Sequence, residues 1–185
     1  MLMKTVVLIG LGSNKSFGPF EPTALVVRAA RALQVLGPIE CTPFYGSEAW
    51  PDPAAPPYVN AVAAVETAAE PESVLEVLLA IEAGFGRRRA GFDRYAPRTL
   101  DLDLLAAGPL RRDTPRLCLP HPRLAERGFV LLPLRDLVPD FVHPVTGRTV
   151  DEMIDGLVSP GTWPLSPQPD LPRSKTRASR AGARA

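Results

Sequence analysis

The run RTLDLDLL, which begins at Arg98, alternates leucine with aspartate and therefore allows few conformations. Successive side chains of a β-strand point to opposite faces, so a strand here holds Asp101 and Asp103 side by side on one face. Leu100, Leu102 and Leu104 then lie on the other face. Two adjacent carboxylates repel each other when no cation lies beside them. The pattern predicts a half-buried strand whose polar face carries a pair of carboxylates.

The order of the remaining patterns defines the fold class. Apolar periodicity predicts a ferredoxin-like βαββαβ sandwich of the α+β class, with an antiparallel sheet, helices packed mainly on one face and a C-terminal extension. A threonine and a glutamate three residues apart, Thr149 and Glu152, form a capping box for a short last helix. The expected strands are 5–9, 39–47, 58–67 and 99–106, and the expected helices run through Leu25, Ala29, Leu33 and Leu36 and from Pro71 to about Gly84.

The composition changes after about Leu157. The last residues are rich in Pro, Ser, Arg and Ala and contain few large apolar side chains. Such a segment lacks the apolar surface that stabilises folded structure. We expect a domain at residues 1–158 followed by a disordered tail at residues 159–185.

Charge and cysteine content exclude several classes of protein. The 185 residues carry 21 basic and 20 acidic side chains, whereas a dedicated nucleic-acid binder usually has a large basic excess. Cys41 and Cys118 lie far apart and have no metal-binding spacing, so neither a disulfide scaffold nor a zinc site is indicated. No apolar stretch approaches the roughly 18 residues of a membrane span. We expect a cytoplasmic monomer with no nucleic-acid or membrane partner.

The two aspartates have the chemistry of a magnesium site. Magnesium in phosphoryl-transfer sites is commonly bound by one or two carboxylates together with substrate phosphates, and two such ions can hold both the attacking and the leaving oxygens. The alternative is an ordinary edge strand whose polar residues face water. The sequence immediately before the aspartates bears on this choice.

Five arginines precede the aspartates within a short, glycine-flanked loop. Guanidinium groups bind polyphosphate oxygens through paired hydrogen bonds and keep their charge at all ordinary pH values. This cluster favours a phosphate site over an edge strand, although a solvated basic loop is the alternative. The arginines are Arg87, Arg88, Arg89, Arg94 and Arg98.

Several segments together resemble one enzyme family. The run from Arg87 through YAPRTLDLDLL, followed by LPHPRLAERGF, which ends at Phe129, looks like the signature region of 6-hydroxymethyl-7,8-dihydropterin pyrophosphokinases. GLGSN, FYGSEAW and YVNAVAAVET resemble further segments of that family, in the family's order. The resemblance implies ATP-dependent transfer of pyrophosphate to the hydroxymethyl group of the dihydropterin, with release of AMP, in folate biosynthesis.

The resemblance also implies roles in ATP binding and catalysis. Asp101 and Asp103 would hold two magnesium ions, and Arg87 and Arg98 would act on the phosphates during transfer. Glu82 matches a family acid near the site. The further ATP contacts that we expect come from Arg89, Arg98, Leu104, Arg116 and His121, although for His121 a structural role in a turn is the alternative.

A second group of residues is implied to bind the pterin. Tyr58 and Phe129 would cover its two faces, and Asn60 would recognise its edge through hydrogen bonds. Tyr58 and Asn60 are two residues apart on a strand and so share a face, which suits a flat heterocycle. For each aromatic residue alone, core packing is the alternative. The remaining expected pterin contacts are Ser47, Glu48 and Trp50.

Other functions fit the sequence less well. Gly10 and Gly12 follow a strand, but Lys15 stands where a dinucleotide-binding fingerprint requires glycine, and no P-loop motif occurs. A small ferredoxin-like RNA-binding module would need aromatic stacking residues, whereas the aromatic content is only 6%. A catalytically impaired relative that binds the nucleotide or the pterin is the closer alternative.

Overall fold

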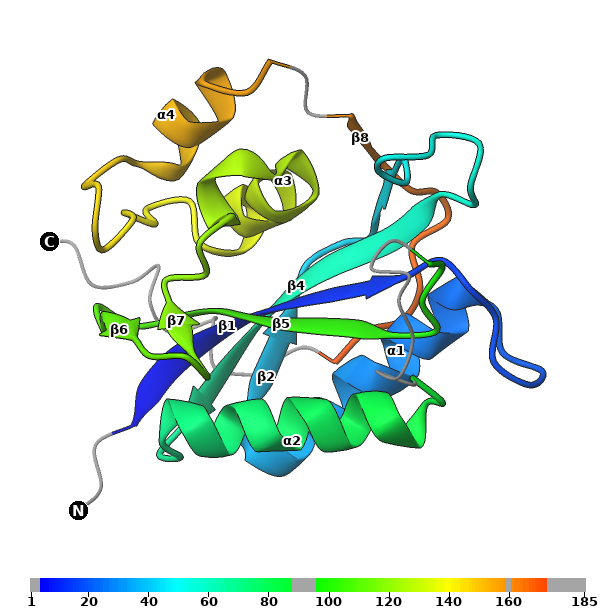
Figure 1. The fold of residues 1–185 in the computed structure, drawn as a ribbon, viewed down its shortest axis with the longest axis horizontal. Helices are drawn as coiled ribbons and strands as arrows, with labels where there is room; N and C mark the ends of the chain where they lie inside the picture. The colour runs from blue at the N-terminus through cyan, green and yellow to red at the C-terminus, as the bar shows by residue number, and fades with distance from the viewer. Residues whose placement is uncertain (1–3, 88–95, 159–160, 173–185) are drawn as a thin grey trace, which may run out of the picture.

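The computed structural model describes residues 4–87, 96–158 and 161–172. Its main sheet has six strands, and every hydrogen-bonded pair of strands in it is antiparallel (Figure 1). The strands are β1 (Thr5–Ser13), β2 (Ile39–Cys41), β3 (Tyr45–Ser47), β4 (Tyr58–Thr67), β5 (Asp101–Ala107) and β8 (Thr162–Pro164), while β6 (Arg112–Asp113) and β7 (Cys118–Leu119) form a separate hairpin.

The sheet order is β5-β1-β4-β3-β8, with β2 also paired to β4. Strand β1 therefore lies between β4 and β5, as a ferredoxin-like fold requires, and the predicted fold class is confirmed. The predicted strand 39–47 is divided into β2 and β3. Pro43 lies between the two parts, and its missing N–H prevents a continuous ladder.

Two helices cover one face of the sheet, as predicted. They pack on the face that carries Val7, Ile9 and Leu11 of β1. The same face carries Leu100, Leu102 and Leu104. Each begins on a proline, whose fixed φ suits the first turn. The helices are α1 (Pro22–Ala32), which continues as the 3₁₀ turn η1 (Leu33–Leu36), and α2 (Pro71–Gly84).

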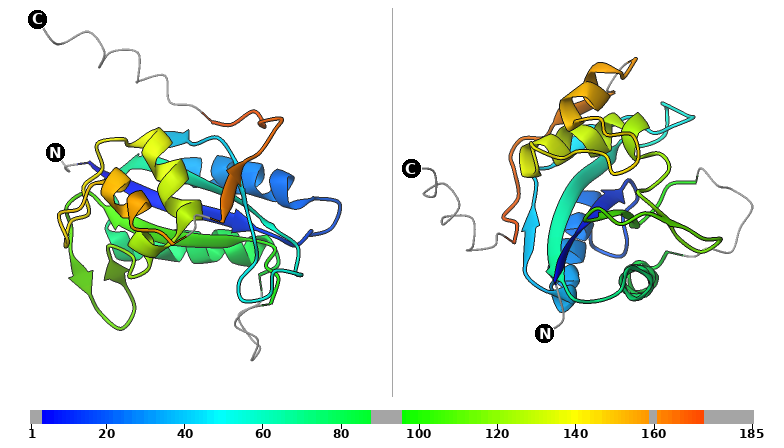
Figure 2. Two further views of the ribbon diagram at one scale, coloured as in Figure 1. Left: turned by 90° about the horizontal axis from the view of Figure 1, so that it is seen from above. Right: turned by 90° about the vertical axis from the view of Figure 1, so that its left-hand side faces the viewer.

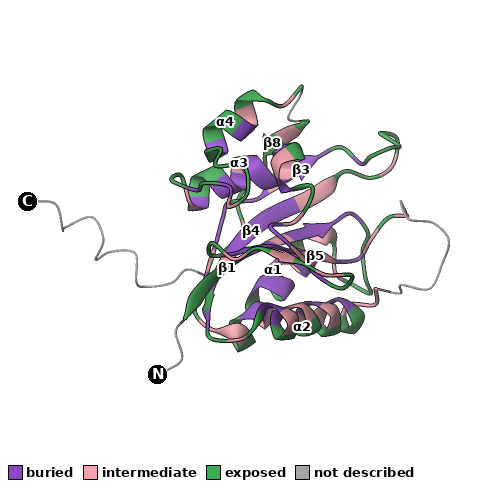
Figure 3. Cartoon of the chain, turned by 60° about the vertical axis from the view of Figure 1, so that its left-hand side comes forward, coloured by how far each residue is buried: buried purple, intermediate pink, exposed green. Residues whose placement is uncertain are grey.

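Two further helices lie on the opposite face, so the prediction of one main helical face has to be extended (Figure 2). They pack on Leu8, Val62 and Leu105 and cover only part of that face. Consecutive residues of β4 and β5 are accordingly buried (Figure 3). The segments are η2 (Leu124–Glu126), α3 (Gly128–Leu137) and α4 (Val150–Asp155).

The capping box of α4 is confirmed. The backbone N–H of Glu152 donates to Thr149 Oγ1 at 3.2 Å, and the N–H of Thr149 donates to Glu152 Oε2 at 2.8 Å. These bonds satisfy two amides that a helix start leaves without intrahelical partners.

Part of the expected tail is ordered against the domain, so the prediction of disorder is wrong for residues 161–172. Strand β8 pairs with β3 at the edge of the sheet, and Leu165 and Leu171 pack against the main core. Contacts with residues distant in sequence therefore outweigh the unfavourable local composition. Residues 173–185 lie outside the described part of the chain. Over the described ranges, no helix combines the length and the apolar character needed to cross a membrane.

A glycine at the end of η1 gives the first prediction. Gly37 has φ of 145°, and a Cβ added there would lie 2.2 Å from the carbonyl oxygen of Glu66. Gly37→Ala should lower the free energy of unfolding by about 1–3 kcal/mol or more, because backbone strain and overlap add. Gly84→Ala, at the last residue of α2, is the control, because no atom beyond its own helix backbone and chain neighbours lies within 4 Å of an added Cβ. Its free energy of unfolding should stay equal or rise by up to about 1 kcal/mol. Equal denaturation midpoints for the two variants would contradict this account.

Candidate active site

Two glycines in the central strand open a pocket on the incompletely covered face of the sheet. Gly10 pairs with Asp103, and Gly12 pairs with Asp101 on one side and with Asn60 on the other. A Cβ built on Gly12 would lie 3.5 Å from Asn60 Oδ1 and 3.9 Å from Asp101 Cβ. Any larger side chain at this position would extend into the space between β4 and β5. The glycines therefore form the floor of the pocket.

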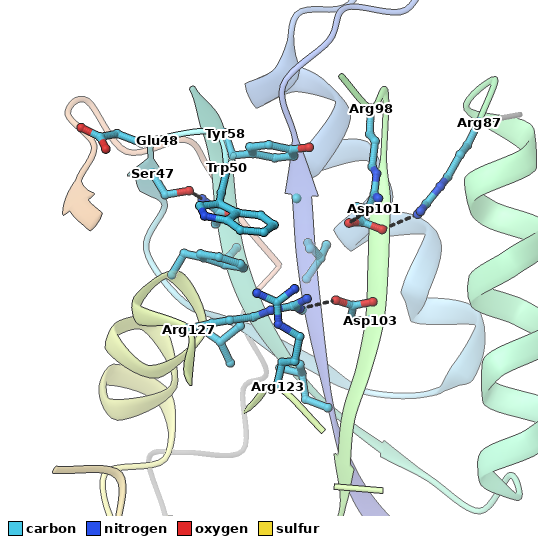
Figure 4. A pocket seen from close by; sticks show the side chains of 18 residues that line it. Ser47, Glu48, Trp50, Tyr58, Arg87, Arg98, Asp101, Asp103, Arg123 and Arg127 are labelled. Atoms are coloured by element: carbon cyan, nitrogen blue, oxygen red, sulfur yellow. Dashed lines mark hydrogen bonds and ion pairs between the residues drawn. The ribbon is translucent and has the colours of Figure 1, made fainter. Parts of the chain in front are cut away.

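The pocket has a volume of about 300 Å³ and gathers most of the predicted site residues. Figure 4 shows Tyr58 and Trp50 on one side of β1 and the two aspartates on the other. The predicted residues that line it are Ser47, Glu48, Trp50, Tyr58, Asn60, Arg87, Arg98, Asp101, Asp103 and Phe129.

The carboxylates of the pocket are surrounded by guanidinium groups. Asp101 Oδ1 is ion-paired with Arg87, and Asp101 Oδ2 accepts from Arg98 Nη1 at 2.5 Å. Asp103 Oδ2 accepts from Arg127 Nη1 at 2.9 Å (Figure 4). Both aspartates keep access to solvent, with side-chain exposures of 21% and 35%. The site thus holds balanced charges at a surface that a ligand can reach.

The aspartates also fit the donor set of a magnesium site that is completed by a ligand. They supply hard oxygen atoms from one face of one strand. In the part of the chain that the structure describes, no three His, Cys, Asp or Glu side chains gather as a metal-binding group. A hard cation held here would therefore take its remaining oxygens from water or from a substrate, which is the usual arrangement for magnesium.

A buried glutamate fixes Arg87 at the end of α2. The side chain of Glu82 is 1% exposed, and its Oε1 accepts from the backbone N–H of Leu102 at 2.8 Å. The same oxygen is ion-paired with Arg87, which also reaches Asp101. Glu82 therefore joins α2 to β5 and holds a guanidinium at the pocket.

Two pKa shifts follow from these surroundings. Burial opposes the charge of Arg98, but the neighbouring Asp101 outweighs it and raises the pKa of Arg98 above its ordinary value. Burial is also the main reason that the pKa of Tyr58 is raised. At neutral pH, Arg98 is a cation and Tyr58 is a neutral phenol.

The side-chain amide of Asn60 is held in place by hydrogen bonds to β3. Asn60 is 4% exposed, and its Nδ2 donates to Ser47 Oγ at 3.0 Å and to the carbonyl of Tyr45 at 3.4 Å. Trp50 lies at the rim and is 67% exposed. The side of the pocket opposite the aspartates thus combines a fixed amide with aromatic surface.

Among the described residues, three of the expected ATP contacts do not line the pocket. Arg89 lies outside those residues. The side chain of Leu104 is buried in the core below the opposite face of the sheet, so it is unable to contact a ligand here. Arg116 Nη2 is 2.9 Å from Glu76 Oε1 on the outer surface of α2. His121 lies beside the pocket, with Nε2 4.0 Å from Asp103 Oδ2.

The surroundings of His121 favour a neutral ring. Burial, more than its charged neighbours, lowers the pKa of this imidazole. The ring Nδ1 accepts from the backbone N–H of Arg123 at 3.1 Å, and the backbone N–H of His121 donates to the carbonyl of Leu105 at 2.7 Å. His121 therefore stabilises a turn and also lies next to the site.

Sequence reasoning missed two arginines and the glycine floor. Arg127 pairs with Asp103 and lies 5.5 Å from the ring centroid of Phe129, and Arg123 lies 5.9 Å from that of Trp50. Nothing in the spacing around these arginines distinguishes them from surface residues. The two glycines could have been found from the sequence. They occupy alternate positions, 10 and 12, of a strand that continues to Ser13, so both lie on one face of it.

A ferredoxin-like sheet with a carboxylate pair, surrounding arginines and an adjoining aromatic pocket defines a phosphoryl-transfer class of enzyme. The family model described as 7,8-dihydro-6-hydroxymethylpterin-pyrophosphokinase (HPPK) matches residues 8–139. The chain belongs to this family, as the sequence resemblance indicated.

Curated relatives agree with this assignment. The 2-amino-4-hydroxy-6-hydroxymethyldihydropteridine pyrophosphokinase of Synechocystis sp. is 36% identical over 165 residues, which cover 89% of this chain and 82% of the relative. The Pseudomonas aeruginosa protein of the same name is 39% identical over 148 residues, which cover 80% of this chain and 89% of the relative.

Solved structures share the fold. The crystal structure of Plasmodium falciparum HPPK-DHPS wild type with STZ-DHP aligns with a TM-score of 0.60 and 13% identity, covering 84% of this chain and 42% of that chain. A structure of HPPK-DHPS in complex with substrates aligns with a TM-score of 0.65 and 13% identity, covering 88% of this chain and 48% of that chain. This chain thus spans less than half the length of those proteins, and the likeness concerns the fold.

The buried position of Glu82 gives a prediction about stability. Glu82→Ala leaves the N–H of Leu102 without its acceptor and Arg87 without one of its carboxylates, so the free energy of unfolding should fall by about 1–3 kcal/mol. Glu76→Ala, also on α2, removes only an exposed pair and should cost less than about 1 kcal/mol. Urea unfolding measures both. Similar losses in the two variants would mean that Glu82 does not join α2 to β5.

Proposed function

We propose that this protein transfers the pyrophosphoryl group of ATP to the hydroxymethyl group of 6-hydroxymethyl-7,8-dihydropterin and releases AMP. The observation that carries the proposal is that one pocket places a carboxylate pair and its arginines opposite a fixed amide beside aromatic side chains. The names of the curated relatives support the same reaction. In this reaction the hydroxyl oxygen bonds to the β-phosphorus, the bond from that phosphorus to the α-phosphate oxygen breaks, and the hydroxyl proton is released.

Asp101 and Asp103 are the residues that we assign to two magnesium ions. They offer hard oxygen ligands on one accessible face, and ATP would supply the oxygens that the chain does not. When bound, magnesium neutralises phosphate charge and polarises the phosphorus–oxygen bonds.

The arginines have to change partners when ligands bind. The two oxygens of Asp101 are taken by Arg87 and Arg98, so they are unable to serve both arginines and a cation at the same time. A guanidinium that leaves a carboxylate can bind a phosphate with the same paired geometry. Arg87 and Arg98 therefore act as the groups that move onto the phosphates and stabilise the charge that develops there.

The other half of the pocket is assigned to the pterin. Asn60 would recognise the edge of the ring, because its amide is already held by Ser47. Tyr58 and Phe129 would contact the faces of the ring, with Trp50 and Glu48 at the rim. A rigid amide costs little further entropy when it binds, which favours selective recognition.

The remaining assignments rest on position beside the pocket or on the family resemblance. His121 is retained as an ATP contact because of its position beside Asp103. Arg89 and Arg116 stay as predictions from the family resemblance. A monomeric state and a cytoplasmic location are also proposed on the basis of the sequence.

The reaction is tested by incubating the protein with ATP, magnesium and 6-hydroxymethyl-7,8-dihydropterin and separating the products. We expect AMP and pyrophosphorylated pterin in equal amounts. Formation of ADP would indicate a different transfer. Binding of both substrates without turnover would indicate a catalytically impaired relative.

Asn60→Ala should weaken pterin binding selectively. Loss of a hydrogen-bonding partner to a buried polar edge costs about 1–3 kcal/mol, which is roughly a factor of 5–150 in the dissociation constant. The affinity for a non-hydrolysable ATP analogue with magnesium should stay unchanged. Calorimetric titration of each ligand provides the measurement, and equal weakening of both would remove Asn60 from the pterin site.

Asp101→Asn and Asp103→Asn should each fold, lose most turnover and need more magnesium for the activity that remains. A neutral amide keeps the shape of the carboxylate but attracts a hard cation far less. The measurement is single-turnover AMP release across a magnesium titration. If the aspartates were only half-exposed strand residues, both variants would keep wild-type rates and an unshifted magnesium midpoint.

A further inference from the structure

The segment at residues 161–172, which follows α4, is built into the edge of the sheet that borders the pocket. We call it the strap. Its strand β8 pairs with β3, so that Thr162 lies opposite Ser47 and Trp163 lies opposite Gly46. Strand β3 thus has β4 on one side and the strap on the other (Figure 1).

Strand β3 depends on this second partner because it is short. It has three residues, follows Pro43 and leads into a proline-rich loop, so its ladder with β4 has little length over which to stabilise itself. Its last residue, Ser47, is the one whose hydroxyl accepts the hydrogen bond from Asn60. Any shift in β3 would move that hydroxyl and the adjoining rim residues Glu48 and Trp50.

A single glutamine fastens the strap to the residue before β3. Gln168 Oε1 accepts from the backbone N–H of Phe44 at 2.6 Å, and its Nε2 donates to the carbonyl of Phe44 at 3.1 Å. That carbonyl also accepts from the N–H of Leu165 at 2.9 Å. The side chain therefore continues the backbone pairing past the end of β8.

The surface of β3 is shaped to receive the strap. A Cβ added to Gly46 would lie 2.4 Å from Nε1 and Cε2 of the Trp163 indole. The backbone of Gly46 has no positive φ, so its lack of a side chain is explained by the indole rather than by a turn. This fit, together with the packing of the partly buried Leu165 and Leu171 against the main core, indicates that the strap is specific to this position.

We infer that the strap is a positioning element for the pterin side of the pocket: it fixes β3, and through Ser47 it fixes the amide of Asn60. The inference rests on the proposed function for the identity of the ligand. In the sheet order, β4 and β1 lie between β3 and the aspartates of β5. Loss of the strap should therefore affect the pterin and leave the nucleotide end of the pocket unchanged.

The test compares the full chain with three variants. The melting temperature of each variant is measured first, to establish that it folds. Gln168→Leu removes the paired hydrogen bonds to Phe44, Trp163→Ala removes the indole from Gly46, and a chain that lacks residues 159–185 removes the strap. A chain that lacks only residues 173–185 is the matched control. The probes are 6-hydroxymethyl-7,8-dihydropterin and a non-hydrolysable ATP analogue with magnesium.

We expect the first three variants to weaken pterin binding by about tenfold or more, the loss expected for one or two disturbed hydrogen bonds. Their affinity for the ATP analogue should match that of the control. Combining Gln168→Leu with Ser47→Ala should add little to either change alone, because both act on the same hydroxyl. Unchanged pterin affinity in folded Gln168→Leu and Trp163→Ala, or equal weakening of both ligands, would overturn the inference.

Amide hydrogen exchange of Gly46 and Ser47 in the free protein separates this inference from the proposed function. These amides should exchange faster in Gln168→Leu than in the wild type, whereas amides of β5 should not. If the wild type bound no pterin, the proposed function would fail while this measurement still reported on the strap. Equal exchange at β3 in the two proteins would contradict the positioning role.

Discussion

The site depends on the absence of two side chains from the middle of the sheet. Strand β1 is paired on both sides along its length, and at Gly10 and Gly12 it presents only backbone to the pocket. Neighbouring strands lie about 4.8 Å apart, so side chains two strands apart meet only if nothing stands between them. The glycines therefore let the residues of β4 and those of β5 line one continuous cavity. The same strand carries Val7, Ile9 and Leu11 into the core on its other face, which keeps the floor rigid.

Charge balance is the second constraint on the site. Asp101 and Asp103 lie close together on β5, and without counter-charges one of them would tend to protonate. Arginines from the end of α2, from the approach to β5 and from the approach to α3 supply those counter-charges in the ligand-free protein. Each of these ion pairs is partly open to solvent. An arginine can therefore exchange its carboxylate partner for a phosphate at a small cost in free energy. The buried Glu82 limits this freedom for Arg87 by holding one side of its guanidinium.

The features that sequence reasoning predicted are those with a local pattern. Alternation in the RTLDLDLL run placed Asp101 and Asp103 on one face, and the two-residue spacing of Tyr58 and Asn60 placed them on another strand of the same pocket. The short helix α4 was predicted from its capping box, whereas α3 was missed because Pro133 interrupts its helical pattern.

The order of the strap was missed for a different reason, which is that its stabilising contacts are all distant in sequence. Gln168 forms hydrogen bonds with the backbone of Phe44, and Trp163 packs on Gly46. Neither contact can be predicted from the composition of the segment alone. Arg127 is similar, since only the folded chain brings it to Asp103. Leu104 shows the opposite case, where the alternation of its own strand should have placed its side chain in the core rather than at a ligand.

The most direct measurement of this account is ligand binding by Gly12→Val. The atoms nearest to an added Cβ lie at 3.5–3.9 Å, so the backbone has room for it, and valine is well suited to a strand. Its methyl groups would occupy the floor of the pocket. We expect a folded protein whose melting temperature stays close to that of the wild type and which binds neither 6-hydroxymethyl-7,8-dihydropterin nor the ATP analogue with measurable affinity in a calorimetric titration. Wild-type affinity for both ligands would show that the glycines of β1 do not form the site.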